Sequence, residues 1–569
     1  MRPLDWTVLV TALVFIVVYG VWKGRGSKDL KGYLLSDRNM SWTTIALSIM
    51  ATQASAITFL STPGQAYVDG MRFVQFYFGL PIAAVILSVT AIPIYHRLKV
   101  YTAYQYLENR FDVKTRSLAA LLFLVSRGLA AGLTIFAPAL VLSVILGWDL
   151  TATNIGVGVL VIIYTASGGT RAVSWTQSYQ MVIIMTGMLL AVLVALYRLP
   201  EGVGLVEATG VAGTLGRMNA IDLSFDLKNK YNIWSGIIGG CFLQLSYFGT
   251  DQSQVQRYLT GKSLTHSRMG LLVNGLVKVP MQFFILFVGA MVFVFYQFQA
   301  PPVFFNPVEV DAVRQTADAE RFAALEGEFH EAFEARRAEV LSLIEARRQG
   351  EAAARGEAVS RLKEADARMA AVRGDAVELM KRNNPGWTSD TNYIFLTFVV
   401  NYLPVGLVGL LIASILFASM SSTSSEINAL ASTTVVDVYK RLVRSEASDR
   451  HYLIVSKVGT VLWGLVAIGF AELFRGRETL VEAVNIVGSL FYGTLLGIFL
   501  AAFFTKRLGG TAVFAGAVAA EIVVLTFHFL TVAGYVDVAY LWYNVIGCGV
   551  VFAVAFAVQP FVNRRSAAA

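Results

Sequence analysis

The chain has 569 residues, of which 56% are hydrophobic and only 15% are charged, and its mean hydropathy is +0.60. A soluble protein of this length would form several domains with far more surface charge, so the composition excludes that class and predicts an all-α polytopic membrane protein. The net charge of +8 is typical of a membrane protein with Lys and Arg in its loops and does not indicate nucleic-acid binding. The two cysteines, Cys241 and Cys548, lie in apolar segments and predict no disulfide framework.

About 13 apolar segments are long enough to cross roughly 30 Å of hydrocarbon. We place them at 5–22, 41–61, 73–96, 117–147, 153–167, 177–198, 231–250, 268–298, 403–436, 452–474, 479–504, 511–533 and 540–559. The first has no basic leader, so we interpret it as a retained span. Basic loops alternate with less basic ones, and the positive-inside rule puts the N-terminus outside and the C-terminus in the cytoplasm. We expect a multi-pass protein of the plasma membrane, or of the inner membrane if the cell is bacterial.

Two of these segments carry small and polar residues in mid-span, which weakens a helix. Residues 48–63 read SIMATQASAITFLSTP, and residues 236–259 contain four glycines with polar residues between them. Broken helices at the middle of the bilayer free carbonyls for cations and amides for anionic groups. The two segments lie five spans apart, where an inverted five-helix repeat would place its two discontinuous helices.

One stretch, residues 309–384, does not read as membrane-spanning. It is rich in Ala, Glu and Arg, and its apolar residues recur at helical spacing. This pattern predicts two amphipathic helices that form a hairpin, broken near RRQGEAAARGEA. By the predicted topology the hairpin lies outside the cell. We interpret it as a solvated spacer, with a lid or a partner-binding surface as the alternative.

Residues 417–425 read FASMSSTSS, with six hydroxyls in nine residues of a long apolar segment. Ala418, Ser421, Ser422 and Ser425 are spaced i, i+3, i+4 and i+7, which places them on one face of a helix. Their oxygens suit a small hard cation. Membrane serines also bond back to their own helix or allow helices to pack closely, so a packing role is the alternative.

Two basic residues, Arg127 and Lys278, lie deep within predicted spans. Cations in such places face a cavity or a partner, with a structural ion pair or snorkelling as alternatives. The sequence has no GxxxxGK[ST], no HExxH and no TVGYG-like filter, which argues against an ATP-driven pump, a metalloprotease and a potassium channel.

Several motifs together resemble the sodium/solute symporter family, which includes sodium/galactose, sodium/proline, sodium/monocarboxylate and iodide transporters. The motifs are YLLSDRNMSW, SAITFLSTPGQAY, IFAPALVLSVILGWDL, YTASGGTRAVSWT, GTDQSQVQRYL and the serine run that leads into STTVVDVYKR. The resemblance implies a LeuT-type core of two inverted five-helix repeats, with one leading and two trailing helices. It divides the chain into a leading helix and loop (1–40), a first repeat (41–200), the start of a second (201–308), the insertion (309–390), the end of the second repeat (391–508) and the trailing helices (509–569).

The resemblance also implies an activity and a site. The activity is sodium-coupled symport by alternating access, not catalysis, with sodium as the coupling ion and no other cofactor. The sodium ligands it implies are the carbonyls of Ala51, Ala54 and Ala418 and the hydroxyls of Ser421 and Ser422. The substrate residues it implies are Gln53, Ser55, Thr58, Gln75, Tyr77, Gln244, Lys278 and Asn485, with Tyr247 as the inner aromatic gate. The partners it implies are sodium, the lipid bilayer and a small organic solute or anion of the carboxylate, sugar, amino acid or vitamin class.

Two departures bear on the solute. Ile57 and Tyr77 stand where the sodium/galactose transporter has acids, which argues against a sugar. The IFAPALVL and QVQRYL pieces favour the monocarboxylate, iodide and vitamin branch, in which Lys278 or Arg127 would meet an anion.

A third departure bears on the coupling ion. Many members have Trp-Thr-Asp at the start of core helix 5, whereas this chain has Trp175-Thr176-Gln177. A neutral amide does not offer the charge of the acid, so we expect one sodium per cycle. Proton coupling, a channel and a transporter-like sensor are the alternatives. Proton coupling would use a titratable group at the cation site, and Ala418, Ser421 and Ser422 offer none.

Overall fold

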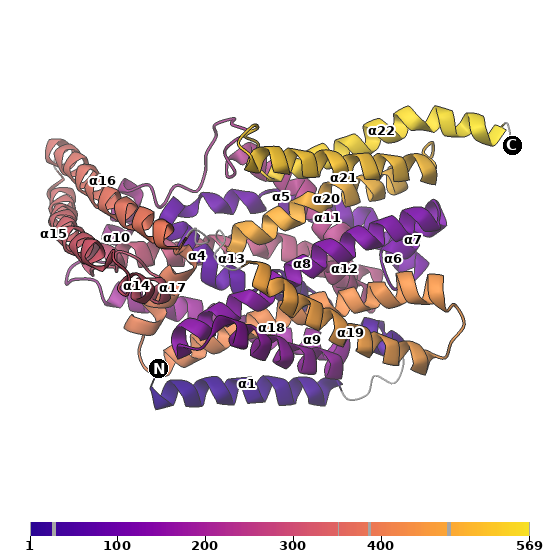
Figure 1. Cartoon of the computed structure of the whole chain (residues 1–569), viewed down its shortest axis with the longest axis horizontal. Helices are drawn as coiled ribbons and strands as arrows, with labels where there is room; N and C mark the ends of the chain where they lie inside the picture. Colours follow the sequence, from indigo (N-terminus) through magenta and orange to yellow (C-terminus); the bar gives the residue numbers. More distant parts are fainter. Residues whose placement is uncertain (1, 25–29, 351, 385–388, 475–479, 568–569) are drawn as a thin grey trace.

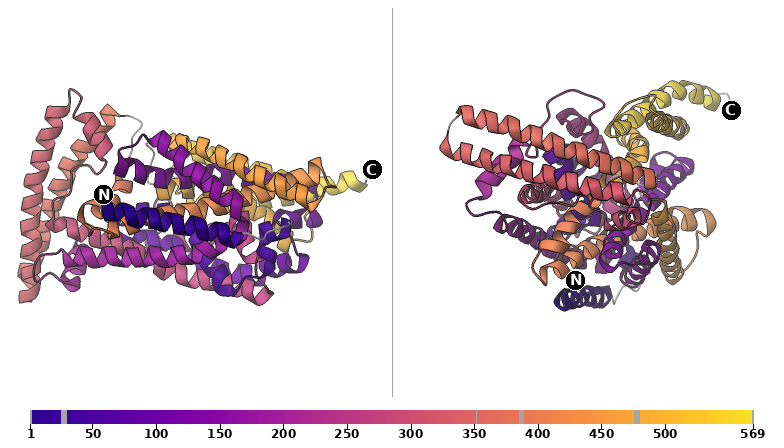
Figure 2. Two further views of the ribbon diagram at one scale, coloured as in Figure 1. Left: turned by 90° about the horizontal axis from the view of Figure 1, so that it is seen from below. Right: turned by 60° about the vertical axis from the view of Figure 1, so that its left-hand side comes forward.

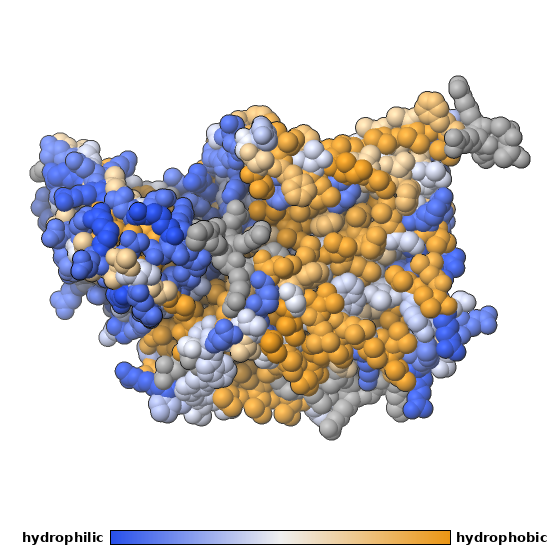
Figure 3. Space-filling model, in the orientation of Figure 1, coloured by the Kyte–Doolittle hydropathy of each residue, from blue (hydrophilic) through white to orange (hydrophobic). Residues whose placement is uncertain are grey.

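The computed structural model describes residues 2–24, 30–350, 352–384, 389–474 and 480–567, which form helices without a β-strand among them. Most helices of the bundle run along one long direction, with the start of α1 toward one end and the end of α22 at the other (Figure 1). An apolar belt covers the bundle, whereas one end carries a hydrophilic projection (Figure 3). Nine helices in the described part are long and apolar enough to cross a membrane. The predicted class is confirmed, while the count of thirteen spans and the sidedness of the termini stay predictions.

The first half of the chain contains a helix that breaks in mid-bundle. Its elements are α1 (Pro3–Gly24), α2 (Leu30–Leu35), η1 (Ser36–Arg38), α3 (Trp42–Gln53), α4 (Ala56–Asp69), η2 (Gly70–Tyr77), α5 (Gly79–Val89), α6 (Ala91–Leu98), α7 (Tyr104–Arg110), α8 (Val113–Leu146), α9 (Leu150–Tyr197) and α10 (Leu205–Thr214). The break between α3 and α4 falls at Ala54, whose φ of −90° and ψ of 75° are not helical. Ser55 is extended, with φ −76° and ψ 174°. The interruption predicted within residues 48–63 is therefore confirmed.

The element α9 joins two of the predicted spans, 153–167 and 177–198, without a loop. A straight helix would separate Tyr164 from Thr176 by about 18 Å along its axis. The two hydroxyls are nevertheless in hydrogen-bond contact. The chain therefore bends between them, and the connection that the sequence predicted as a loop is helical.

The second half begins with another interrupted helix. Its elements are η3 (Ser235–Gly239), α11 (Gly240–Gly249), α12 (Gln252–Leu259), α13 (Leu264–Phe298), α14 (Pro307–Val313), α15 (Ala319–Gln349), α16 (Ala352–Asn383), α17 (Thr391–Tyr402), α18 (Leu407–Thr433), η4 (Thr434–Val443), α19 (Asp449–Ala471), η5 (Glu472–Phe474), α20 (Leu480–Phe504), α21 (Gly510–Val532) and α22 (Leu541–Ala567). The interruption falls at Thr250 and Asp251. It directly follows Gly249, the last glycine of the predicted segment 236–259, while the first glycines of that segment lie in or beside the π-helical turn η3.

Two glycines let backbones approach closely around the broken helix. A Cβ added at Gly289 of α13 would lie 2.1 Å from the Pro63 carbonyl oxygen of α4. A Cβ at Gly79 of α5 would lie 2.2 Å from the backbone nitrogen of Cys241 in α11. Any side chain at either position would push the helices apart, so the glycines fix α4 against α13 and α5 against α11.

The predicted helical hairpin is α15 and α16, which lie side by side at one end of the bundle (Figure 2). The helix α15 ends at Gly350, whose φ of +75° is the left-handed conformation that terminates helices. Apolar side chains form a small core between the two helices: Phe322, Leu325, Phe329, Met369 and Leu379 are all at most 5% exposed. The hairpin is therefore a packed pair of helices, and its role as a solvated spacer, a lid or a partner-binding surface stays a prediction.

Candidate functional site

The serine run of α18 faces the broken end of α3. Ser421 Oγ donates to the Ala51 carbonyl oxygen at 3.3 Å, and Ser422 Oγ lies 3.4 Å from the same oxygen. Ser422 Oγ also donates to the Ala418 carbonyl at 3.0 Å. All four residues are at most 2% exposed. The structure thus brings together four of the five predicted sodium ligands, from helices 370 residues apart in the chain.

Ala54, the fifth predicted ligand, is the residue at which α3 breaks. Its N–H still donates to the Met50 carbonyl at 2.8 Å, but its ψ turns the following residues out of the helix. The last carbonyls of α3, Ala51 among them, thereby lose their helical partners. Freed carbonyls beside two hydroxyls form an uncharged set of oxygens that suits a hard cation.

The other hydroxyls of the serine run hold helices together. Ser419 Oγ donates to the Thr134 carbonyl of α8 at 2.6 Å, and Thr423 Oγ1 donates to Thr134 Oγ1 at 3.0 Å. Ser424 Oγ bonds back to the Ser421 carbonyl at 3.0 Å. The packing role considered for the whole run thus applies to these three residues, while Ser421 and Ser422 face α3.

Gln177 of α9 joins α3 to α18 beside this cluster. Its Nε2 donates to Thr52 Oγ1 at 3.1 Å and to Ser425 Oγ at 3.0 Å. The same nitrogen donates to the Ser421 carbonyl at 3.3 Å, while Oε1 accepts from Ser48 Oγ. The amide NH2 group therefore sits within oxygens from α3 and α18 and supplies the partial positive charge among them.

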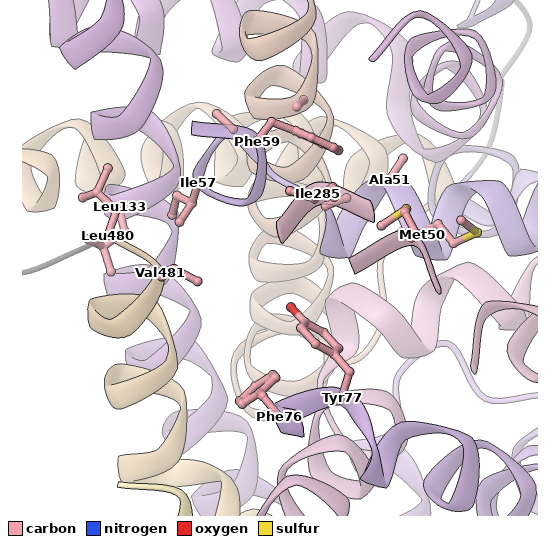
Figure 4. Close-up of a cluster of buried hydrophobic side chains, with 14 of the residues drawn as sticks. Met50, Ala51, Ile57, Phe59, Phe76, Tyr77, Leu133, Ile285, Leu480 and Val481 are labelled. Atoms are coloured by element: carbon pink, nitrogen blue, oxygen red, sulfur yellow. The ribbon is translucent and has the colours of Figure 1, made fainter. Parts of the chain in front are cut away.

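A cavity of about 80 Å³ lies beside the break, between α4, η2, α8, α11 and α20. Seven of the predicted substrate residues line it: Gln53, Ser55, Thr58, Tyr77, Gln244, Tyr247 and Asn485. Phe76 and Tyr77 point from η2 toward the break, with Ile57 and Val481 on the opposite wall (Figure 4). Such a space holds a few water molecules or a small solute.

Two predicted substrate residues, Gln75 and Lys278, lie outside the lining of this cavity. Gln75 Nε2 donates to the Tyr231 carbonyl at 2.8 Å, and its Oε1 accepts from the Asp222 N–H at 2.9 Å, so its amide fastens η2 to the loop before η3. Lys278 Nζ lies 5.4 Å from the centroid of the Tyr77 ring and is fully buried. Within the described residues its amine has no hydrogen-bond partner.

The floor of the cavity is a buried ionic network that the sequence did not predict as a unit. Arg127 Nη1 pairs with Glu426 Oε1 at 3.0 Å, and Arg127 Nη2 contacts both Asp251 and Tyr492. Thr134 Oγ1 donates to Glu426 Oε2 at 2.8 Å. Arg127 is therefore held by two carboxylates, which is the ion-pair alternative that its position in a span left open. Glu426, an acid inside the predicted span 403–436, was the available signal, whereas Asp251 lies just beyond the predicted span 231–250.

Tyr247 closes the cavity toward α12. Its hydroxyl accepts from Gln254 Nε2 at 2.6 Å, and its ring centroid lies 5.9 Å from that of Tyr492. The Arg127 guanidinium lies over the same ring, with Cζ 5.4 Å from its centroid. The aromatic residue predicted as the inner gate thus stands between the cavity and α12.

Comparisons with known proteins identify the family of the chain. The family model described as the sodium:solute symporter family matches residues 33–325 and 384–523. Sodium-coupled monocarboxylate transporter 1 of Xenopus laevis is 27% identical over 499 residues, which cover 87% of this chain and 67% of that protein. The human sodium/iodide cotransporter is 26% identical over 522 residues, which cover 90% of this chain and 68% of that protein.

A solved structure has the same fold. It is a Na⁺-coupled sialic acid symporter in a substrate-bound, outward-open state, with a TM-score of 0.73 and 22% sequence identity over 98% of each chain. This similarity shows that the chain has the LeuT-type helical fold. The residues between the two stretches that the family model matches, 326–383, are most of the hairpin α15–α16.

Proposed function

Because the chain belongs to the sodium:solute symporter family, we propose that it imports a small monocarboxylate together with one sodium ion. The protein is a multi-pass membrane protein and a sodium-coupled symporter, not an enzyme. The observation that carries the finer proposal is the cluster of uncharged oxygens from Ala51, Ala418, Ser421 and Ser422 at the broken helix, next to a small polar cavity.

Sodium is proposed to bind between the break and α18. The hydroxyls of Ser421 and Ser422 now donate to carbonyls, and a cation at this place would turn their lone pairs inward and replace those hydrogen bonds. Ala54, at the break, would add its carbonyl. A site built of neutral oxygens takes on the full charge of the ion, so sodium binding should respond to membrane voltage by about 2.3 kcal/mol per charge per 100 mV. The complete cycle, with one sodium ion and one carboxylate anion, moves no net charge.

One sodium per cycle is supported by Gln177. The two hydrogens of its NH2 group are shared among Thr52, Ser425 and the Ser421 carbonyl, so these oxygens already face a neutral donor. A second cation there would have to displace the amide without gaining a carboxylate.

The cavity supports a small anionic solute. The helix α4 starts at the wall of the cavity. The side chain of Ser55, its N-cap residue, makes no hydrogen bond to the first N–H groups of the helix. These groups therefore present the positive end of the helix dipole. Gln53 Oε1 and both amide atoms of Gln244 are buried without a partner among the described residues. The amide donors and the start of α4 can receive a carboxylate, and the apolar wall formed by Ile57 and Val481 can receive a short aliphatic chain.

Alternating access follows from differential affinity. Sodium must bind the outward-facing state more tightly than the inward-facing one, because a ligand with equal affinity for both shifts nothing. For the solute and sodium to be released to the cytoplasm, Tyr247 must break its hydrogen bond with Gln254 and its ring must move away from the Arg127 guanidinium.

The test is uptake of labelled lactate and acetate into proteoliposomes. An inward sodium gradient should drive accumulation, while a proton gradient in potassium buffer should not. The variant Ser421→Ala/Ser422→Ala should lose sodium-driven uptake. Its matched control, Ser424→Ala, removes a hydroxyl that only bonds back to its own helix and should keep it. Accumulation driven equally by protons would overturn the sodium assignment, and uptake of a sugar in place of the carboxylates would overturn the solute class.

A further inference from the structure

A second cavity lies where the hairpin meets the bundle, far from the sodium cluster. It has a volume of about 90 Å³ and is walled by α4, α13, α15, α16 and the segment after α10. Its wall on α4 is Tyr67, which is 11 residues beyond Ala56 and so about 16 Å along the helix from the break. Three arginines line it, Arg217, Arg336 and Arg373, against a single acid, Asp366.

Two of the three arginines form ion pairs, and the third does not among the described residues. Arg336 pairs with Asp366 at 3.2 Å, and Arg373 pairs with Asp390 at 2.8 Å. Arg217 has no carboxylate at ion-pair distance in the described part of the chain; its Nη1 donates only to the Leu215 carbonyl, at 3.4 Å. Burial lowers the pKa of Arg217 from its ordinary value, against the pull of nearby acids. Asp366 and Asp69 act on Arg217 only through space, so its buried positive charge is partly compensated and poorly hydrated.

The three guanidinium groups also keep unused donors. The Nε atoms of Arg217, Arg336 and Arg373 are buried and have no hydrogen-bond partner among the described residues. An aromatic ring lies against each of the three groups. Arg217 Cζ lies 4.7 Å from the centroid of Phe293, Arg373 Cζ lies 5.5 Å from that of Phe305, and Arg336 Cζ lies 5.7 Å from that of Phe333. A buried donor without a partner is costly, so these three donors can be satisfied by an anion in the cavity.

The charges converge on one place. All three arginines act electrostatically on the hydroxyl of Tyr67. That hydroxyl is itself a donor on the cavity wall. A cavity of this volume exceeds the ~10–15 Å³ that one water-sized particle needs, and it is too small for a nucleotide or a peptide.

We propose that this cavity binds a small anion, which pairs with Arg217 and bridges the hairpin to the bundle. Its chemistry suits a halide or a short carboxylate, so the two sources are chloride from the medium and the solute itself. Arg336, Asp366 and Arg373 lie in residues 326–383, outside the family match, whereas Tyr67, Arg217 and Phe293 lie inside it. The site therefore exists only because this chain carries the hairpin.

Occupancy has a structural consequence. Arg373 also holds Asp390, at the start of α17, and Arg336 donates to the Tyr296 carbonyl of α13 at 2.9 Å. An anion that neutralises the cluster would strengthen the docking of α15 and α16 on both helices.

The test uses the purified full chain in choline salts without sodium, so that the coupling-ion site stays out of the measurement. Choline gluconate is replaced by choline chloride, or in a second arm by choline acetate, at constant ionic strength. The unfolding midpoint should rise in a saturable way, by about 1 °C at ten times Kd for a chain of this length. Amide hydrogen exchange within α15 and α16 should slow over the same concentration range. A response to chloride alone identifies a halide site, and a response to acetate alone identifies a carboxylate site.

Variants tie the response to the cavity. Arg217→Gln should abolish it. Arg347→Gln is the matched control, because Arg347 also joins the hairpin to the bundle, through Thr214 at 2.9 Å, but lies outside the cavity lining. Asp366→Asn should tighten anion binding, since it removes the only acid from the lining. No response to either anion in the wild type, an equal response in Arg217→Gln, or weaker binding in Asp366→Asn would overturn the proposal.

Discussion

The two broken helices of the bundle satisfy their freed backbone groups in opposite ways. At the α3–α4 break the Ala51 carbonyl is met by the neutral hydroxyls of Ser421 and Ser422. At the α11–α12 break Asp251 accepts the Ser253 N–H at 2.9 Å with one carboxylate oxygen and pairs with Arg127 through the other.

This difference indicates which kind of helix break can bind an ion. Hydroxyls can rotate and exchange a hydrogen bond for a cation, whereas a carboxylate already held by a guanidinium and a backbone N–H has nothing to exchange. The first break therefore suits the proposed sodium site, which we call the exchangeable site, and the second is a fixed joint beside the cavity.

The largest expected effect is on the fixed joint. Arg127→Ala would leave the carboxylates of Asp251 and Glu426 buried without their cation. We expect a loss of about 3–5 kcal/mol in the free energy of unfolding, measured by thermal or denaturant unfolding in detergent. Arg314→Ala, which removes an exposed ion pair to Glu326, should cost under about 1 kcal/mol. Similar losses in the two variants would contradict the buried network.

The next effect is on the exchangeable site. At a sodium concentration 100 times Kd, bound sodium should stabilise the wild type by about 2.7 kcal/mol relative to choline. Ser421→Ala/Ser422→Ala should lose this increment, while its stability without sodium falls by only about 1 kcal/mol for each hydrogen bond removed. Thermal unfolding in sodium and in choline measures both quantities. A sodium increment that survives in the double variant would mean that these serines only pack.

A smaller effect sharpens the contrast by adding a charge to the neutral site. Gln177→Asp would place a carboxylate near Thr52 and Ser425 and remove the competing NH2 group. The sodium dependence of uptake should then steepen from a Hill coefficient of about 1 toward 2, because a second cation gains an anionic ligand. Gln177→Asn keeps the amide and serves as the control. An unchanged Hill coefficient in Gln177→Asp would refute the role given to the amide.

The smallest effect concerns a charged joint at the surface. The hydrogen bond from Arg441, and then that from Arg116, lowers the pKa of Glu108 in α7. A carboxyl with a lowered folded-state pKa stabilises fully above its unfolded pKa of about 4.3 and loses this contribution as pH falls through the folded value. Glu108→Gln should therefore lose less stability than the wild type between about pH 5 and 3. Parallel unfolding midpoints against pH in the two proteins would count against the ion pair.

Much of the exchangeable site was predictable because its signal is local. Small residues before Ser55 indicated a break, and the spacing of Ala418, Ser421 and Ser422 placed oxygens on one helix face. The resemblance to a known family then connected the two segments, which periodicity alone does not do. The hairpin was also predictable, since amphipathic spacing and a glycine at position 350 are local features.

The fixed joint was not predictable in the same way, because its pairs lie far apart in the chain. Arg127 meets Glu426 across 299 residues, and no pattern within either helix specifies that meeting. Gln75 was predicted to line the cavity, but its position depends on the direction in which η2 turns, which the sequence does not specify. Its side-chain amide instead forms hydrogen bonds with the backbone of Tyr231 and Asp222. In α9 the connection predicted as a loop is helical. Local sequence did not predict this, because contacts such as that of Tyr164 with Thr176 can hold a bend within a helix.

The docked hairpin has a practical consequence for imaging. Helices buried in a detergent micelle give weak orientation signals, and two inverted repeats give the particle an approximate symmetry. The pair α15 and α16 stands clear of the apolar belt (Figure 3) and is anchored by Arg336 and Arg373. It is a built-in fiducial, an asymmetric feature outside the micelle that fixes the orientation of each particle in electron cryo-microscopy.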